Sequence, residues 1–173
     1  SYNDQWDLYE TTGGIRAPAA WDLATGAGVT VAVIDTGIRP HADLSGQIVA
    51  GYDMIKDTAV ANDGNARDSD ASDPGDWTAA GECAAGEPAS GSSWHGTHVA
   101  GTIAARTNNA SGIAGIAFNA KIQPIRVLGK CGGYTSDIAD GMIWASGGSV
   151  TGLPANATPS KVLNLSLGGG GAC

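Results

Sequence analysis

The sequence predicts an α/β fold in which a mostly parallel sheet lies between layers of helices. Short apolar runs alternate along the chain with segments of helical periodicity, which is the pattern of βαβ crossovers. The apolar runs are unbroken, as expected for strands that are covered on both faces. A length of 173 residues suffices for one substantial core, so we predict a single domain over residues 1–173.

Four apolar segments are predicted to be strands. The first, residues 29–34 (VTVAVI), is rich in β-branched residues, and Asp35 follows at its carboxyl end. The other predicted strands are residues 47–54, 122–128 and 162–167. Ligands of open α/β sheets bind beyond the carboxyl ends of strands, so Asp35 lies where a functional site is expected.

Two segments are predicted to be helical and one to be a long loop. Residues 96–105 are small and apolar and directly follow His95. A second helix begins at Thr135 or Ser136, whose hydroxyl can cap it. Residues 57–93 are polar and lack periodicity, so we predict a long acidic surface loop or insertion, and its length favours function or a bound ligand.

Composition and charge exclude two classes of partner. The chain has 9 basic and 17 acidic residues, a formal charge of −8 that repels nucleic acid phosphates and anionic membrane surfaces. No apolar run approaches the roughly twenty residues that span a bilayer. The chain begins at Ser1 rather than Met, so we expect a processed terminus and an exported protein.

The three cysteines show no C-x-x-C spacing, so a zinc or thioredoxin-type site has no support. In an exported protein two of them can pair, and we predict a disulfide between Cys83 and Cys131. Cys173 is the last residue and is expected to pair with something beyond it. The alternative is three free, buried thiols in a cytosolic protein.

Two motifs carry the chemistry, VIDTG with Asp35 and WHGTHVAGT with His95. A neutral imidazole can take a proton from a hydroxyl when a buried carboxylate holds its other ring nitrogen. Taken alone, an Asp after a strand can be a turn residue and a His before a helix can be a cap. Together the motifs favour an orienting acid, Asp35, and a general base, His95.

The segments VIDTG, HGTHVAGT, TNNASGIAGIAFNAKIQPIRVLG and LNLSLGG resemble, in sequence and order, the subtilisin family of serine endopeptidases. The match covers most of residues 15–171. The resemblance implies a three-layer subtilisin-like fold, here incomplete at its C-terminal side, and a secreted bacterial enzyme. It implies hydrolysis of peptide bonds by an Asp–His–Ser acyl-enzyme mechanism with Asp35 and His95 as the first two members, while His98 is structural.

The nucleophilic serine of the family's Gly-Thr-Ser-Met type motif, and its oxyanion asparagine, have no counterpart in this chain. We therefore expect the serine to come from sequence beyond residue 173. The remaining C-terminal part of the same catalytic domain would then be a partner, linked by a disulfide through Cys173, and a polypeptide would be the substrate.

The resemblance also implies two extended segments that pair with substrate backbone on opposite sides of the cleft, a form of β-augmentation. Glycine suits such segments because it gives access to the backbone. Without the family, these glycines would be ordinary turns. The residues are Gly132, Gly133 and Tyr134 on one wall, and Ser166, Leu167 and Gly168 on the other.

Calcium is the implied cofactor. The resemblance places a tight site around the Asp43 carboxylate, with side-chain and backbone oxygens from Gln5, Thr107, Asn109, Ser111 and Ile113. Separately, carboxylates crowd the acidic loop, and these repel one another unless a cation or solvent screens them. This favours either a solvated loop or a second calcium site that uses some of Asp63, Asp68, Asp70, Asp73 and Asp76.

Two other classes of function stay open at this point. One is a non-catalytic, calcium-stabilised binding module with a subtilisin-like fold, whose natural gene would stop near residue 173. The other is a metallohydrolase that uses His95, His98 and a carboxylate. The HGTH motif lacks the neighbouring Glu of zinc hydrolases, which disfavours this second alternative.

Overall fold

The computed structural model describes residues 2–170 and contains one parallel sheet in the order β2–β3–β1–β4. The strands are β1 (Thr30–Asp35), β2 (Tyr52–Asp53), β3 (Lys121–Arg126) and β4 (Val162–Asn164). β1 and β3 pair along their whole length, which sets Asp35 opposite Arg126. The predicted parallel sheet, with Asp35 at a carboxyl end, is confirmed.

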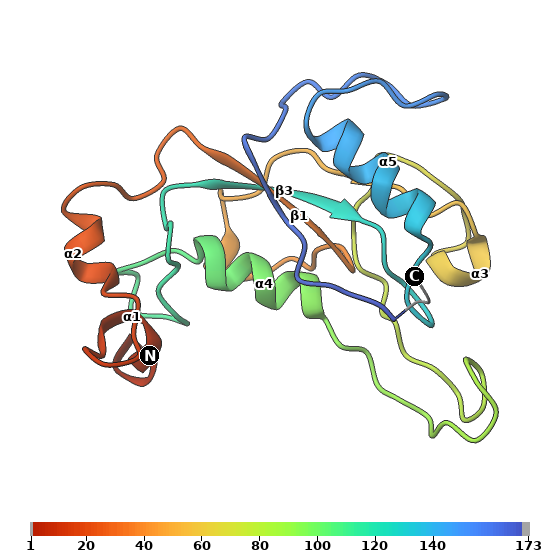
Figure 1. Ribbon diagram of the computed structural model, residues 1–173, viewed down its shortest axis with the longest axis horizontal. Helices are drawn as coiled ribbons and strands as arrows, with labels where there is room; N and C mark the ends of the chain where they lie inside the picture. Colours follow the sequence, from red (N-terminus) through yellow and green to blue (C-terminus); the bar gives the residue numbers. More distant parts are fainter. Residues whose placement is uncertain (1, 171–173) are drawn as a thin grey trace.

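Helices cover both faces of the sheet, α4 (His95–Ala104) on one and α5 (Thr135–Ala145) on the other (Figure 1). Side chains alternate across a strand, and β1 divides its residues accordingly. Val31 and Val33 pack in the cluster that contains the buried alanines of α4. Ala32 and Ile34 pack with Trp144 of α5. The unbroken apolar run of β1 therefore serves two cores, and the predicted three layers are present.

The remaining helices are short, and the sequence analysis did not predict them because three to five residues are too few to establish a period. They are η1 (Tyr2–Asp4), α1 (Trp6–Tyr9), α2 (Ala17–Trp21), η2 (Ala42–Leu44) and α3 (Thr58–Ala61). None of the helices formed by residues 2–170 has the length and apolar character needed to cross a bilayer.

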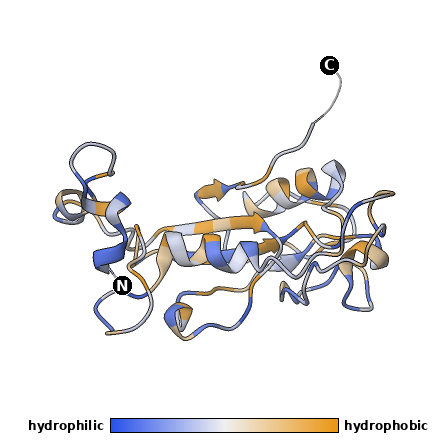
Figure 2. Ribbon diagram, turned by 90° about the horizontal axis from the view of Figure 1, so that it is seen from below, coloured by the Kyte–Doolittle hydropathy of each residue, from blue (hydrophilic) through white to orange (hydrophobic). Residues whose placement is uncertain are grey.

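Two predicted strands are shorter than expected. In the segment 47–54 only β2 and a single bridge between Ile48 and Ile122 remain. The neighbouring position on β3 is Pro124, which has no N–H to donate and so interrupts the ladder. The segment 162–167 leaves the sheet after β4, and Figure 2 shows the chain running out from the body of the molecule there.

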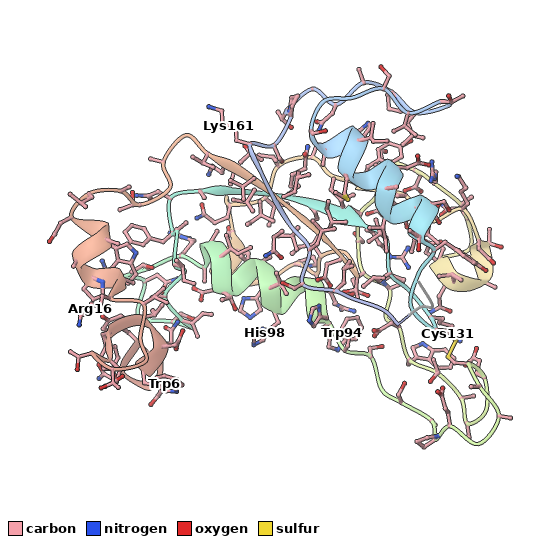
Figure 3. The ribbon with its side chains drawn as sticks, viewed as in Figure 1. Trp6, Arg16, Trp94, His98, Cys131 and Lys161 are labelled. Atoms are coloured by element: carbon pink, nitrogen blue, oxygen red, sulfur yellow. A yellow bond between two sulfur atoms is a disulfide. The ribbon has the colours of Figure 1, made fainter. Side chains whose placement is uncertain are left out.

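The acidic loop, residues 57–93, is anchored at several points. Bridges join Ile38 to Ser72 and Asp53 to Asp68, and its outer part projects from the molecule (Figure 1). The predicted disulfide between Cys83 and Cys131 is present, with a Cα–Cα distance of 5.3 Å, and it ties the outer part to the segment after β3 (Figure 3).

A buried arginine fastens the inner part of the same loop to the sheet. Arg126 Nη1 donates to Asp53 and, at 2.7 Å, to Asp63, while Nη2 donates to the Ala61 carbonyl. Arg126 and Asp53 are almost fully buried. Burial raises the pKa of Asp53 to about 6, against the opposing effects of the Ile55 N–H and Arg126.

Candidate active site

Asp35 and His95 come together at the carboxyl end of β1. His95 Nδ1 lies 2.8 and 2.9 Å from the two carboxylate oxygens of Asp35. Asp35 is fully buried, whereas the His95 side chain is 46% exposed. The Asp35 carboxylate also accepts a hydrogen bond from the Thr36 N–H at 2.7 Å. The acid is thus fixed within the protein, and the ring that it holds reaches the surface.

The approach of α4 to β1 depends on two glycines. A Cβ at Gly96 would lie 2.4 Å from the Gly37 carbonyl oxygen and 3.2 Å from Asp35 Oδ1. Gly37 has a φ of +100°, which L side chains rarely adopt. Gly37 of the Asp-Thr-Gly motif and Gly96 of the His-Gly motif therefore let α4 and β1 come close enough for the carboxylate to contact the ring.

A cavity of ≈ 780 Å³ opens beside His95. Five of the six predicted substrate-binding residues line it: Gly132, Gly133, Ser166, Leu167 and Gly168. Tyr134 is not among the lining residues, because it is the N-cap of α5 and its hydroxyl donates to Asp57 at 3.3 Å. The structure thus brings both predicted walls to the cavity that the base faces.

The predicted calcium residues also meet, around Asp43, which is buried. Its carboxylate accepts from Asn109 Nδ2 at 2.6 Å and from the Ile113 N–H at 3.0 Å, and Asn109 Oδ1 accepts from the Ser111 N–H. The hydroxyl of Thr107 is buried and has no partner among the described residues. Gln5 lies next to the same loop, where its amide pairs with the backbone of Ala114 at 2.7 and 2.8 Å.

This group fits a calcium ion in its donor chemistry. Calcium prefers carboxylate, amide and carbonyl oxygens, which are what Asp43, Asn109, Gln5 and the loop backbone offer. The oxygen and nitrogen of an amide have nearly the same shape, so turning Asn109 about its last bond presents an oxygen in place of Nδ2.

The five carboxylates of the acidic loop that were predicted as ligands of a second calcium ion are not brought to one point. Asp63 binds Arg126, Asp68 accepts from Asn65 and from the Asp70 N–H, and Asp70 accepts from the Ser72 N–H. Asp73 and Asp76 accept from Thr36 and Ser93, respectively. Within residues 2–170, no group of three or more His, Cys, Asp or Glu side chains is arranged to hold a metal ion. The geometry thus gives the second calcium site no support.

The position of His95 also bears on the metallohydrolase alternative. His98 lies three residues after His95 on α4 (Figure 3), but His95 Nδ1 is bonded to Asp35, as a general base requires. The predicted link through Cys173 concerns a residue outside the described range. Thr36, Asp73 and Asp76 adjoin the site, and sequence reasoning gave none of them a role at the base.

The fold, the motifs and the arrangement of Asp35 and His95 define a subtilase. The profile of the subtilase family matches residues 26–173, and the chain belongs to this family.

Among particular relatives, the chain is 63% identical over 171 residues to an extracellular protease of Xanthomonas campestris pv. campestris, covering 99% of this chain and 30% of the relative. It is 51% identical to an extracellular basic protease of Dichelobacter nodosus, covering 100% of this chain and 29% of the relative. A solved structure of a protease from Pseudoalteromonas arctica superposes with a TM-score of 0.97 at 66% identity, over 99% of this chain and 50% of that one. The chain thus spans about a third of the length of its curated relatives.

Proposed function

We propose that the protein containing this chain is an extracellular serine endopeptidase. The observation that carries the proposal is the contact between the buried Asp35 carboxylate and His95 Nδ1, at 2.8 Å, beside a cavity lined by both predicted substrate walls. Membership of the subtilase family and the names of the two relatives, both extracellular proteases, support it.

In this proposal Asp35 holds the His95 ring in the tautomer whose Nε2 can accept a proton. His95 then takes the proton of a serine hydroxyl, which attacks the carbonyl carbon of the peptide, and returns it to the leaving amine. The resulting acyl-enzyme is hydrolysed by water, which His95 activates in the same way. The serine is proposed to come from sequence that follows residue 173 in the natural protein. The fraction of its relatives that the chain covers is consistent with this.

A polypeptide in extended conformation is the proposed substrate. Segments 132–133 and 166–168 line the same cavity as His95, and all five residues except Leu167 are exposed. An extended peptide laid between them can form backbone hydrogen bonds on both sides, with little dependence on side chains. These segments would therefore orient the scissile bond, while pockets for side chains set the preference.

We further propose that a calcium ion binds at Asp43. Asp43, Asn109 and Gln5 would supply side-chain oxygens, and Thr107, Ser111 and Ile113 carbonyl oxygens. The ion would neutralise the buried carboxylate and brace residues 107–113 between α4 and β3. The burial of the Asp43 carboxylate against Asn109 and Ile113 of this loop supports the assignment, because a bound cation would offset the cost of burying that charge.

The test of the function is covalent labelling of the natural full-length protein by a fluorophosphonate, which reacts with activated serine hydroxyls. We expect one adduct per molecule by mass spectrometry, on a serine that follows residue 173, and loss of peptide hydrolysis. His95→Ala should label at least about 10³-fold more slowly, because the base is missing. A wild-type protein that neither labels nor cleaves peptides would contradict the proposal and favour the binding module.

A further inference from the structure

The helix that carries His95 begins without the usual side-chain cap. Its N-cap residue, Trp94, has a left-handed backbone conformation with a φ of 52°, and its side chain forms no capping hydrogen bond (Figure 3). The first N–H groups of a helix have no partner within the helix, so a group from elsewhere must accept from them. In this protein one acceptor comes from Thr36, after β1, and the other from Ser93, which directly precedes the N-cap residue.

Two hydroxyl groups accept from the first two residues of α4. The Gly96 N–H donates to Thr36 Oγ1 at 3.0 Å, in a buried position. The His95 N–H donates to Ser93 Oγ at 3.3 Å, at the surface. The helix start is therefore tied on one side to the residue that follows Asp35 and on the other side to the end of the acidic loop.

Each hydroxyl is held in turn by a carboxylate of the acidic loop. Thr36 Oγ1 donates to Asp73 Oδ2 at 2.8 Å, and Ser93 Oγ donates to Asp76 Oδ2 at 2.7 Å. A hydroxyl has one proton, so donating it to a carboxylate leaves only lone pairs for the helix. The two carboxylates thus fix the orientation of the hydroxyl groups, so that each hydroxyl oxygen presents a lone pair to an N–H group of the helix.

The two pairs differ in their environment. Thr36 and Asp73 are each only 4% exposed and their hydrogen bond is buried, whereas the bond between Ser93 and Asp76 is exposed. Thr36, Ser93 and Asp76 all line the cavity beside His95. Burial raises the pKa of Asp73, and the hydrogen bonds from Thr36 and the Gly75 N–H oppose this effect. A hydrogen bond to a charged group is worth most where water cannot replace it, so the buried pair should matter more.

We propose that the acidic loop positions the catalytic base through these two hydroxyl–carboxylate pairs. This inference rests on the proposed function, because it concerns the base of that site. The backbone of Gly96 lies directly against Asp35 and Gly37. Any shift of the first turn of α4 therefore moves the His95 ring relative to the carboxylate that orients it. Asp73 and Asp76 would act as positioning residues through Thr36 and Ser93; Asp73 lies outside the cavity, whereas Asp76 also lines it.

The principal test compares Thr36→Val with Thr36→Ser in the natural full-length protein. Valine keeps the shape of threonine and removes the hydroxyl, while serine keeps the hydroxyl. We expect Thr36→Val to lower kcat about tenfold, because a charge-assisted hydrogen bond is lost. KM should stay within about twofold, because valine keeps the shape of Thr36 in the cavity lining and the walls at residues 132–133 and 166–168 are unchanged. Thr36→Ser should stay within about threefold of wild type.

A second readout follows the ring itself. The proton that His95 Nδ1 shares with Asp35 gives a separate downfield signal in proton NMR, which should shift or broaden in Thr36→Val and return in Thr36→Ser. Asp73→Asn should behave like Thr36→Val, because an amide offers one acceptor where Thr36 and the Gly75 N–H both donate. Thr78→Val removes a hydroxyl that pairs with Ser90 in the outer part of the loop and is the matched control.

The outcomes separate this inference from the proposed function. Wild-type kcat and an unchanged signal in Thr36→Val would overturn it, as would equal losses in Thr36→Val, Thr36→Ser and Thr78→Val. If Thr36→Val does not fold, Ser93→Ala at the exposed pair should still lower kcat about threefold, and wild-type kcat there would overturn the inference. A wild-type protein without peptidase activity would refute the proposed function but not the positioning of His95, because the NMR signal tests that positioning without any activity.

Discussion

At the level of single side chains, the site combines a buried acid, Asp35, with an exposed base, His95, and the two side chains are in contact. Asp35 is fully buried and accepts from Thr36 as well as from His95, so it has no freedom to turn away. The His95 ring is half exposed, as the proposed general base would have to be in order to meet a substrate. This combination of a fixed acid and an accessible base is the requirement for general-base catalysis at neutral pH.

Replacing the acid without changing its size tests this account. In Asp35→Asn the amide can donate to Nδ1, which stabilises the tautomer whose Nε2 carries the proton and cannot act as a base. We expect kcat of the full-length protein to fall about 10⁴-fold, with KM changed little. Peptide hydrolysis measured over a range of substrate concentrations checks this, and a loss below about tenfold would show that Asp35 does not orient the base.

At the level of segments, the acidic loop ties together the elements that carry the site. The acidic loop reaches the sheet through Arg126, the helix start through Asp73 and Asp76, and the segment after β3 through the disulfide. On that segment Lys130 lies 2.8 Å from Glu82 and 3.7 Å from the centre of the Trp77 ring. The loop is therefore a structural part of the site, and its length follows from the number of places that it must reach.

Calcium removal tests the other loop. Without the ion, the Asp43 carboxylate keeps only its hydrogen bonds from Asn109 and Ile113, so we expect chelation to lower the thermal midpoint of the protein and expose residues 107–113 to proteolysis. Calorimetric titration should show tight calcium binding that Asp43→Asn abolishes. A midpoint that is the same with and without calcium would contradict the assignment.

The same titration decides the second calcium site of the sequence analysis. An ion that still binds to Asp43→Asn would revive the site in the acidic loop, and Asp68→Asn should then remove it. Equal protection of the acidic loop from proteolysis before and after chelation would count against that site.

At the scale of the whole molecule, a buried charge network joins three elements. Arg126 of β3 binds Asp53 of β2 and Asp63 of the acidic loop, and its Nε is buried without a partner among the described residues. Removing one member of such a network leaves another charge buried and unpaired, which costs several kcal/mol. The network fixes how the loop lies on the sheet, and its stability should depend on pH.

The raised pKa of Asp53 sets the sign of that dependence. The folded protein binds this proton more tightly than the unfolded chain does, so the free energy of unfolding should fall as pH rises from 3.8 to about 6. The full effect of such a shift is about 3 kcal/mol. Urea unfolding of wild type and Asp53→Asn at several pH values isolates this contribution, since other carboxyls titrate in both proteins.

In that experiment the difference in stability between wild type and Asp53→Asn should change across this window. For the exposed Asp22→Asn variant, the free energy of unfolding should change with pH in the same way as it does for wild type. A difference that stays constant with pH would show that Arg126 keeps Asp53 ionised throughout.

Local sequence patterns sufficed for the strand β1, the two long helices and the pair Asp35 and His95. An unbroken apolar run, a helical period and two motifs of five to nine residues are each complete within a short window. The apolar run and the helical period follow directly from backbone geometry. The same patterns overestimated the strand at 47–54, because the residue that interrupts it, Pro124, belongs to a different strand.

The partners of buried polar groups were set by the packing of distant segments. Thr36 meets Asp73 across 37 positions of sequence, and Arg126 meets Asp53 across 73. No period or motif records such pairs, because a carboxylate needs only a donor within reach, and any segment can supply one. The chain thus carries its chemistry in local motifs, while the arrangement that positions the base arises only when remote segments are buried together.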